Sequence, residues 1–314
     1  MNHLERALDN QNKWWKPLLV ILGIVGATVI IQILLVVIYI FANFSAPMLE
    51  SMQDDPDLLL EQMMGDQNFM FPLIFMSSLA SIVVGALVIW ALYKRNFKEV
   101  INGTQKVRWD RFFFSFGVWF GLMAIYLLLS YLFNPRDFTF SFNFYNFIIL
   151  LILSIIAIPF QASFEEFVFR GYLAQLVASW TKSRWSSIIL PAIIFGLMHI
   201  ANPEVEEYGV LMMMPQYIFM GVVFGLMSVL DDGIECAMGA HTANNIFLCV
   251  FLTFDGSVLP TEAIFRAANI NPIGDFVSII IMSVLFIFTL GFFFQWDFKI
   301  LSSRIESKEK VDLD

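Results

Sequence analysis

Residues 18–44 read LLVILGIVGATVIIQILLVVIYIFANF, an apolar run that contains no Asp, Glu, Lys or Arg. A helix that crosses a bilayer needs ~20 mostly apolar residues, so this run predicts a membrane span. The run is too long for the apolar region of a cleaved signal peptide, and the segment before it is polar. We therefore expect the span to be retained and the protein to be integral to the membrane.

The rest of the 314-residue chain has the same character. Hydrophobic residues make up 59% and charged residues only 14% of it, whereas soluble domains carry about 25% charged residues. The net charge of -9 arises mostly in loops, and no basic patch indicates a nucleic-acid partner. Cys236 and Cys249 lie in one apolar stretch, where we expect small core residues rather than a disulfide.

Apolar runs separated by polar residues predict eight spans, and hence an all-α, polytopic transmembrane helical bundle. The fifth run is short, and the sixth and seventh are separated only by Asp231, Asp232 and Gly233. The eight predicted spans lie at roughly 18–44, 69–93, 112–133, 144–178, 185–200, 211–230, 233–254 and 272–296.

The positions of Lys and Arg predict how the spans are oriented, because cytoplasmic loops are enriched in these residues. With the N-terminus in the cytoplasm, only Arg136 and Arg266 of the 18 basic residues fall in outer loops. We therefore expect both termini to be cytoplasmic and the protein to lie in the cell membrane. Seven of the eight tryptophans are near predicted inner ends, as interfacial anchors are: Trp14, Trp15, Trp90, Trp109, Trp180, Trp185 and Trp296.

The first predicted outer loop, 45–68, contains no Lys or Arg. Its acidic residues include Asp54, Asp55, Asp57, Glu61 and Asp66. We interpret them as a solvated acidic loop, with binding of a divalent ion as the minor alternative.

Ionisable side chains inside a span are costly in hydrocarbon, so they are candidates for function. The fourth span contains Glu165, Glu166 and Arg170. Residues four apart share a helix face, so Glu166 and Arg170 are predicted to pair as structural support. Glu165 points about 100° away and is predicted to be the reactive carboxylate, a general base. The alternative is an amphipathic helix end with three solvated charges.

Two of the three histidines, His199 and His241, also lie inside apolar runs, whereas His3 lies in the polar N-terminal tail. His241 shares a helix face with Asn245, one turn further on, and Asn244 is the rival for that place. A buried amide in a span needs a partner or a task.

Three of these residues are predicted to meet at similar depth. At ~1.5 Å of rise per residue, Glu165, His199 and His241 lie ~20, ~21 and ~12 Å from the inner ends of their spans. This holds only if the fourth helix continues to about residue 178. The sequence therefore predicts one site built from three spans, inside the bilayer and nearer its cytoplasmic half.

The three clusters resemble the motifs of the CAAX-protease and bacteriocin-processing (CPBP, or Abi) family. This family includes type II CAAX prenyl endopeptidases and lysostaphin-resistance-A-like proteins, and its motifs are EExxxR, FxxxH and HxxxN or HxxxD on separate spans. The resemblance covers roughly residues 145–255, and all three motifs occur in the family's order. In this chain they are Glu165-Glu166-x-x-x-Arg170, Phe195-x-x-x-His199 and His241-x-x-x-Asn245.

The resemblance implies an intramembrane endopeptidase that acts on a membrane-associated substrate, either CAAX-like or a secreted peptide. It implies that Glu165 and His199 activate a water molecule, while His241 and Asn245 stabilise the oxyanion. The family has also been described as metallopeptidases, and Glu165, His199 and His241 would then form a His₂Glu zinc site. No HExxH spacing supports zinc here, so we favour glutamate catalysis without a cofactor.

On this basis the chain divides into three parts. Residues 1–143 hold the first three spans and the acidic outer loop, 144–255 the catalytic core, and 256–314 the last span and the cytoplasmic tail. Two other classes of function stay open, a proton-coupled transporter and a non-catalytic immunity or scaffold protein. Transporters commonly show internal repeats and spans interrupted at matched positions, and the sequence shows neither. The complete set of motifs argues against the non-catalytic class.

Overall fold

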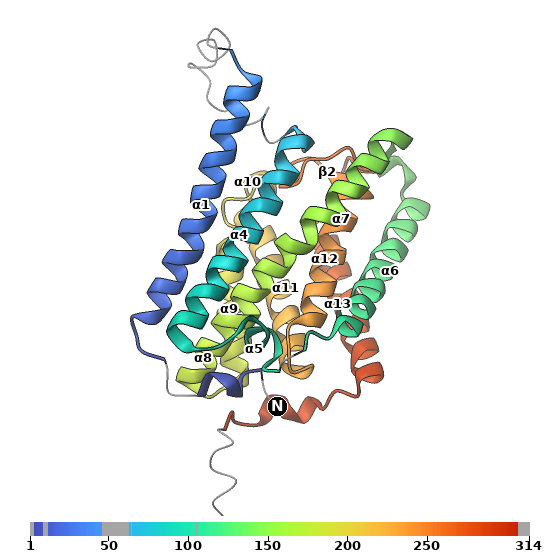
Figure 1. Cartoon of the computed structure of the whole chain (residues 1–314). Helices are drawn as coiled ribbons and strands as arrows, with labels where there is room; N and C mark the ends of the chain where they lie inside the picture. The colour runs from blue at the N-terminus through green and yellow to red at the C-terminus, as the bar shows by residue number, and fades with distance from the viewer. Residues whose placement is uncertain (1–2, 9–11, 46–62, 64, 105, 307–314) are drawn as a thin grey trace, which may run out of the picture.

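The computed structural model describes residues 3–8, 12–45, 63, 65–104 and 106–306. Long helices run side by side in a tilted bundle (Figure 1), so the predicted all-α, polytopic bundle is confirmed. The helical elements are η1 (Glu5–Leu8), α1 (Lys16–Asn43), α4 (Gln67–Tyr93), α5 (Phe97–Asn102), α6 (Trp109–Phe133), η2 (Pro135–Asp137), α7 (Phe144–Glu166), η3 (Phe167–Leu173), α8 (Ala174–Thr181), α9 (Arg184–Leu197), α10 (Pro203–Tyr208), α11 (Val210–Leu230), α12 (Glu235–Val250), α13 (Pro272–Phe294) and η4 (Phe298–Ser302).

Each of the eight predicted spans corresponds to a helix, but the helices differ in length. Among the described residues, six helices are long and apolar enough to cross a membrane, namely α1, α4, α6, the continuous α7–η3–α8 helix, α11 and α13. The helix α9 has only 14 residues and α12 only 16. The count of eight spans therefore stays a prediction. The fourth helix does continue to Thr181, as the depth argument requires.

A small sheet interrupts the end of the predicted seventh span, which was expected to reach residue 254. The helix α12 ends at Val250, and β2 (Leu252–Phe254) follows. β2 pairs in parallel with β3 (Phe265–Ala267), which pairs antiparallel with β1 (Phe138–Phe140). The backbone of 252–254 thus finds hydrogen-bond partners in β3 instead of in another helical turn.

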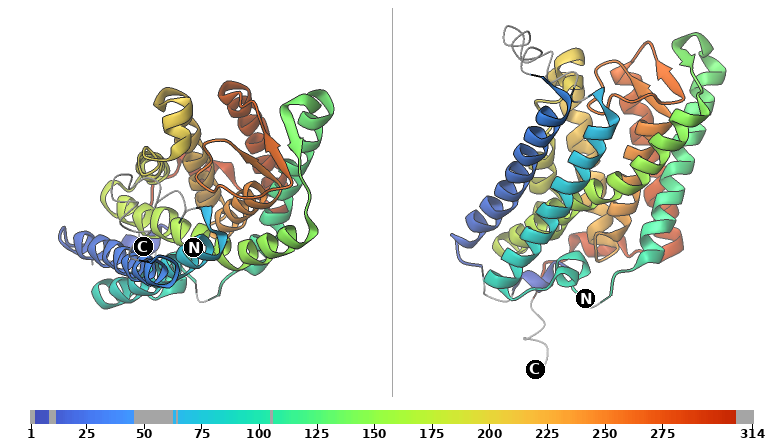
Figure 2. Two further views of the ribbon diagram at one scale, coloured as in Figure 1. Left: turned by 90° about the horizontal axis from the view of Figure 1, so that it is seen from above. Right: turned by 45° about the horizontal axis from the view of Figure 1, so that its top comes forward.

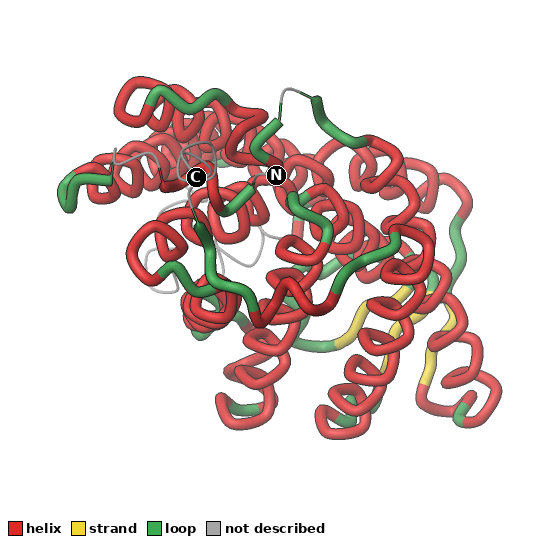
Figure 3. The backbone as a smooth tube through the Cα atoms, turned by 90° about the horizontal axis from the view of Figure 1, so that it is seen from below, coloured by secondary structure: helices red, strands yellow, loops and turns green. Residues whose placement is uncertain are grey.

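The two ends of the described chain lie at the same end of the bundle (Figure 2, right), which Figure 3 shows from below. We call this the inner end, following the predicted topology, and the end with the sheet the outer end. Of the acidic residues in the first outer loop, only Asp66 is described. It accepts a hydrogen bond from the Asn68 amide at 2.9 Å and one from the Tyr39 hydroxyl at 2.8 Å.

The core lies between α6, α11, α12 and α13, around Trp119, Phe224, Phe247 and Phe286. The helix α1 packs on α4 and exposes large apolar side chains along its length. Phe41, for example, is 85% exposed. So extended an apolar face is unusual for a protein surrounded by water, and it is the surface that hydrocarbon chains cover.

Close helix contacts position the elements that carry the predicted site. A Cβ atom on Gly239 of α12 would lie 2.1 Å from the carbonyl oxygen of Phe112 in α6. One on Gly221 of α11 would lie 2.9 Å from Cα of Ala192 in α9. Small residues of this kind let helix backbones approach each other inside a membrane.

A polar cluster holds α12 at the inner end. Glu235, which is buried, forms an ion pair with Arg108 at 2.6 Å and accepts a hydrogen bond from the Asn102 amide. Arg108 also lies 3.2 Å from Asp231, whose carboxylate accepts a hydrogen bond from the Trp296 indole at 2.8 Å. The charges that would be costly if left unpaired are therefore paired with one another.

The N-terminal segment is packed beneath this cluster rather than extended into solvent. His3 is 1% exposed, and its backbone N–H donates to the Asp232 carboxylate at 3.0 Å. Burial lowers the pKa of the His3 imidazole from 6.5 to about 4. His3 is therefore neutral in the folded protein at neutral pH.

We expect this burial to make folding sensitive to acid. Between pH 6.5 and about 4 the unfolded chain binds a proton at His3 that the folded chain excludes, so stability falls as the pH decreases through this range. From about pH 7.5 to 5.5 the free energy of unfolding should drop by about 1.3 kcal/mol through this residue. Unfolding of the wild type and of His3→Leu, measured at both pH values, checks this. An equal loss in the two proteins would contradict it.

Candidate active site

The two carboxylates of the first motif lie where α7 changes its geometry. Glu165 and Glu166 end α7, and the next seven residues, Phe167–Leu173, form the π-helix η3. Single π-helical turns within longer helices are frequent at functional sites. The change in winding comes directly after the two glutamates and includes Arg170.

Glu166 is the most enclosed of the charged residues. Its Oε1 accepts hydrogen bonds from Arg170 at 2.9 Å and from Nδ1 of His241 at 2.7 Å, and the carboxylate is fully buried. The guanidinium of Arg170 also donates to the carbonyl of Gly221 at 3.2 Å and lies 4.4 Å from the centre of the Phe195 ring. The ion pair predicted between Glu166 and Arg170 is present. The contact of Glu166 with His241 was not predicted.

His241 is held in one tautomer by this contact. A carboxylate oxygen accepts, so Nδ1 carries the hydrogen, and in the neutral ring Nε2 presents a lone pair. Nε2 lies 3.7 Å from Oε2 of Glu165, which is too far for a direct hydrogen bond. A small molecule beside this gap would contact both atoms. Phe224 stacks on the imidazole with the ring centres 5.1 Å apart.

Glu165 is joined to Asn245 through a residue that the sequence analysis missed. Gln161 donates from Nε2 to Oε1 of Glu165 and accepts at Oε1 from Nδ2 of Asn245 at 2.9 Å. The side chain of Glu165 is 20% exposed, unlike that of Glu166. Gln161 lies four residues before Glu165 in an apolar run, and that spacing was the signal available in the sequence.

The structure distinguishes the two neighbouring asparagines. Asn245 faces Gln161, as above. Asn244 accepts a hydrogen bond from the Trp119 indole at 3.3 Å and donates to Oδ1 of Asn245 at 3.1 Å. Asn244 therefore lies behind Asn245 and supports it, on the side away from Glu165.

His199 adjoins this network without a hydrogen bond to it. Its Nδ1 lies 2.7 Å from the carbonyl oxygen of Phe195, so Nδ1 carries the hydrogen and Nε2 is left as the acceptor. The Phe195 ring lies between the two histidines, 4.5 Å from His199 and 6.1 Å from His241 by ring centres. Tyr217 stacks on His199 at 4.5 Å.

Tyr217 is a second residue that the sequence analysis did not single out. The amide of Asn202 donates to its hydroxyl at 3.1 Å. Tyr217 lies in α11, whereas His199 follows the end of α9 at Leu197. It therefore closes the His199 side of the site.

The zinc alternative requires Glu165, His199 and His241 to meet as one ligand set. Within the described part of the chain, no three His, Cys, Asp or Glu residues come close enough together to hold a metal ion. The side chains thus do not form the His₂Glu set, and no step is derived through a metal.

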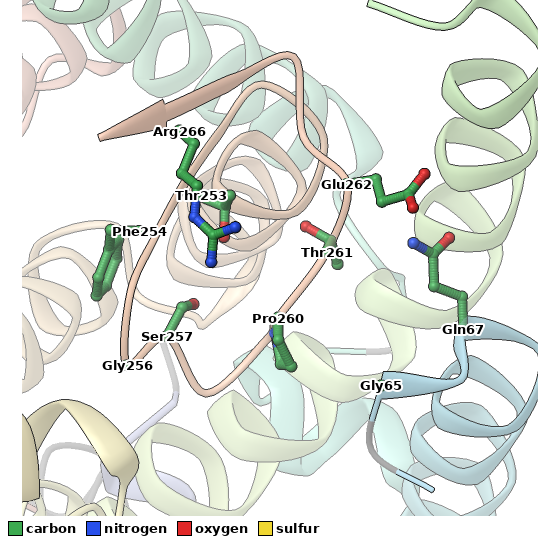
Figure 4. A pocket seen from close by; sticks show the side chains of 10 residues that line it. All are labelled: Gly65, Gln67, Thr253, Phe254, Gly256, Ser257, Pro260, Thr261, Glu262 and Arg266. Atoms are coloured by element: carbon green, nitrogen blue, oxygen red, sulfur yellow. The ribbon is translucent and has the colours of Figure 1, made fainter. Parts of the chain in front are cut away.

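A pocket of about 270 Å³ lies at the outer end, apart from this network (Figure 4). Its polar lining includes Gln67, Thr253, Ser257, Thr261, Glu262 and Arg266, and none of the predicted site residues lines it. Glu262 accepts from Asn146 at 2.5 Å, and Arg266 pairs with Asp255.

Comparison with known proteins agrees with the motifs. Residues 144–247 match the family described as Type II CAAX prenyl endopeptidase Rce1-like. The chain is also similar to a protein of Bacillus subtilis (strain 168) named "Uncharacterized protein YyaK", with 29% identity over 295 residues, which are 91% of this chain and 94% of that protein. No solved structure matches the chain.

The match over residues 144–247 confirms the resemblance to the CAAX-protease family that the motifs indicate. The apolar helices indicate an integral membrane protein, and the match supports a membrane protease at the level of the family.

We expect the two adjacent glutamates to differ in their effect on stability. Glu166→Gln leaves Arg170 buried without its ion pair, which costs about 3–5 kcal/mol in comparable cases. Glu165→Gln removes a partly exposed carboxylate that no Lys or Arg pairs with in the described part of the chain and that lies 3.7 Å from His241, and the change should be within about 1 kcal/mol. Thermal unfolding of the two variants in detergent measures the difference. If Glu165→Gln were the more destabilised variant, the assignment of Glu166 as the support would be wrong.

Proposed function

We propose that this protein is an intramembrane endopeptidase that hydrolyses a peptide bond with a water molecule activated by Glu165 and His199. One observation carries the proposal. Glu165 and the Nε2 atom of His241 face each other across 3.7 Å inside the bundle, while Glu166 fixes the His241 ring from behind. A base and a hydrogen-bond donor on either side of one position are what hydrolysis of an amide requires.

In this proposal Glu165 is the general base. Its Oε2 is buried and has no hydrogen-bond partner among the described residues, so it is free to accept a proton from water. His199, with its free Nε2, contacts the same water from the α9 side. The hydroxide attacks the carbonyl carbon, the C–N bond breaks, and the departing amine takes the proton back from Glu165.

His241 and Asn245 stabilise the oxyanion of the tetrahedral intermediate. In this proposal His241 donates from Nε2 to the oxyanion in the form that carries a hydrogen on both ring nitrogens, while its Nδ1–H is held by the Glu166 carboxylate. Asn245 uses one hydrogen of its amide on Gln161 and has the second for the oxyanion. Because the site is largely enclosed, both hydrogen bonds act with little competition from water.

The substrate in this proposal is a membrane-associated peptide or protein, either CAAX-like or a secreted peptide. The shared end of the termini and the distribution of Lys and Arg support a cell-membrane protein with both termini in the cytoplasm. The part that carries the chemistry is residues 144–255, which include the matched segment 144–247.

The proposal predicts that purified protein in nanodiscs cleaves members of a membrane-peptide library. Mass spectrometry of the peptides measures the cleavage. Replacing the base in Glu165→Gln should slow cleavage by ~10²–10⁴-fold. Asn245→Leu should slow it by ~10²–10³-fold through loss of an oxyanion donor, and Asn244→Leu by less.

Asp275→Asn is the matched control. This carboxylate lies away from the site and accepts a hydrogen bond of 2.6 Å from the Tyr126 hydroxyl. It should leave the rate within about twofold. The contrary result is a wild type that cleaves no peptide that the Glu165→Gln variant leaves intact. That result would contradict the proposal and place the protein in the non-catalytic immunity or scaffold class instead.

Metal removal gives a separate prediction. Since no His₂Glu set is formed by the described side chains, dialysis of active protein against a strong chelator should leave the cleavage rate unchanged within about twofold. A loss of activity that added zinc restores would show that the glutamate mechanism is wrong.

A further inference from the structure

A second cavity, of about 320 Å³, lies at the inner end and takes no part in the proposed chemistry. Its walls are two chain segments that are far apart in sequence, the turn between α8 and α9 (181–185) and the segment around the end of η4 (301–304). We propose that this cavity binds the phosphate of an anionic phospholipid headgroup. The inference goes beyond the proposed function.

The backbone brings two basic residues together at this cavity. The Ile305 N–H donates to the carbonyl of Lys182 at 3.0 Å, and Ser183 and Arg304 form an antiparallel bridge. Lys182 and Arg304 are both exposed, and neither has an ion pair within the described part of the chain. The backbone therefore brings two cations together without a counter-charge from the described residues.

A third basic residue, Arg184, also lines the cavity, but its charge is paired with that of Glu5. It is buried, and it donates to Glu5 at 2.8 Å and to the hydroxyl of Ser303 at 3.1 Å. Glu5 neutralises Arg184, so the net charge of the cavity comes from Lys182 and Arg304. Arg184 instead ties the N-terminal and C-terminal segments together, which fixes the shape of the cavity.

The other lining groups fit a phosphate ester. Thr181, Ser302 and Ser303 line the cavity together with the two cations. The hydroxyls of Thr181 and Ser303 donate to the carbonyls of Val177 and Ile300, so Ser302 is the hydroxyl that can donate to a phosphate. Lys and Arg with hydroxyl donors are the usual partners of phosphate oxygens. The first turn of α9, which begins at Arg184, adds the positive end of a helix dipole.

The position of the cavity indicates a lipid rather than a soluble phosphate. Trp185 lines it and is 45% exposed, and Trp180 on the adjoining turn of α8 is 60% exposed. Exposed tryptophans at a helix end mark the level of lipid headgroups. Basic pockets at that level bind the headgroups of anionic lipids.

The test uses full-length protein in an uncharged detergent, titrated with phosphatidylglycerol, phosphatidylcholine or glycerol phosphate. Thermal unfolding and native mass spectrometry report binding. Phosphatidylglycerol should raise the unfolding midpoint in a saturable way, and the other two compounds should not. In the double variant Lys182→Asn/Arg304→Gln, the phosphatidylglycerol concentration at half-saturation should be at least roughly tenfold higher than in the wild type.

Lys98→Gln/Lys106→Gln is the matched control, because it removes the same charge from exposed residues at the same end. It should change half-saturation less than about twofold. Arg304→Gln alone guards against misfolding, because Lys182 has a left-handed backbone and Arg304 does not. This single variant should show a weaker form of the same defect.

Three results would overturn the inference. Equal weakening in the two double variants would show only a general attraction to a basic surface. Equal stabilisation by phosphatidylcholine would show that charge is not recognised. A shift with glycerol phosphate at the same concentration would make a soluble phosphate ester, and not a lipid, the ligand.

Discussion

The buried carboxylate of Glu166 is the group on which the site depends. A charge in the interior of a helical bundle is costly unless it is paired and hydrogen-bonded. Glu166 meets this requirement through Arg170 on its own helix and His241 on α12, and Arg170 extends the link to the Gly221 carbonyl of α11. Three parts of the bundle are thus held together by one carboxylate, and the tautomer of His241 follows from it.

This arrangement explains why two adjacent glutamates have different surroundings. Glu166 lies against Arg170 and is sealed in, whereas Glu165 points into a partly open space and is contacted by the neutral amide of Gln161. The Oε2 atom of Glu165 has no hydrogen-bond partner among the described residues, as a group that takes a proton from water requires. Gln161 and Asn244 complete the network, so that Asn245 cannot turn without breaking two hydrogen bonds.

The polar groups of the inner end have a different purpose. Arg108, Glu235 and Asp231 pair with one another, and Arg184 joins Glu5 to Ser303, so the chain's two terminal segments are packed onto the bundle. Figure 3 shows these segments crossing beneath the helices. Lys182 and Arg304 differ from these paired charges because they are exposed and form no ion pair within the described residues.

The sequence by itself determined the all-α membrane bundle, the positions of its long helices, the resemblance to the CAAX-protease family, and the pairing of Glu166 with Arg170. These follow from local properties, namely apolar length, charge placement and the four-residue spacing of a helix. Only the tertiary structure decided that Glu166 also binds His241, that Gln161 joins Glu165 to Asn245, that Tyr217 stacks on His199, and that residues 252–254 form a strand. Most of these contacts join elements that are far apart in the sequence, and sequence separation does not give their distance in space. The others depend on which atom of a side chain its neighbours leave without a hydrogen bond.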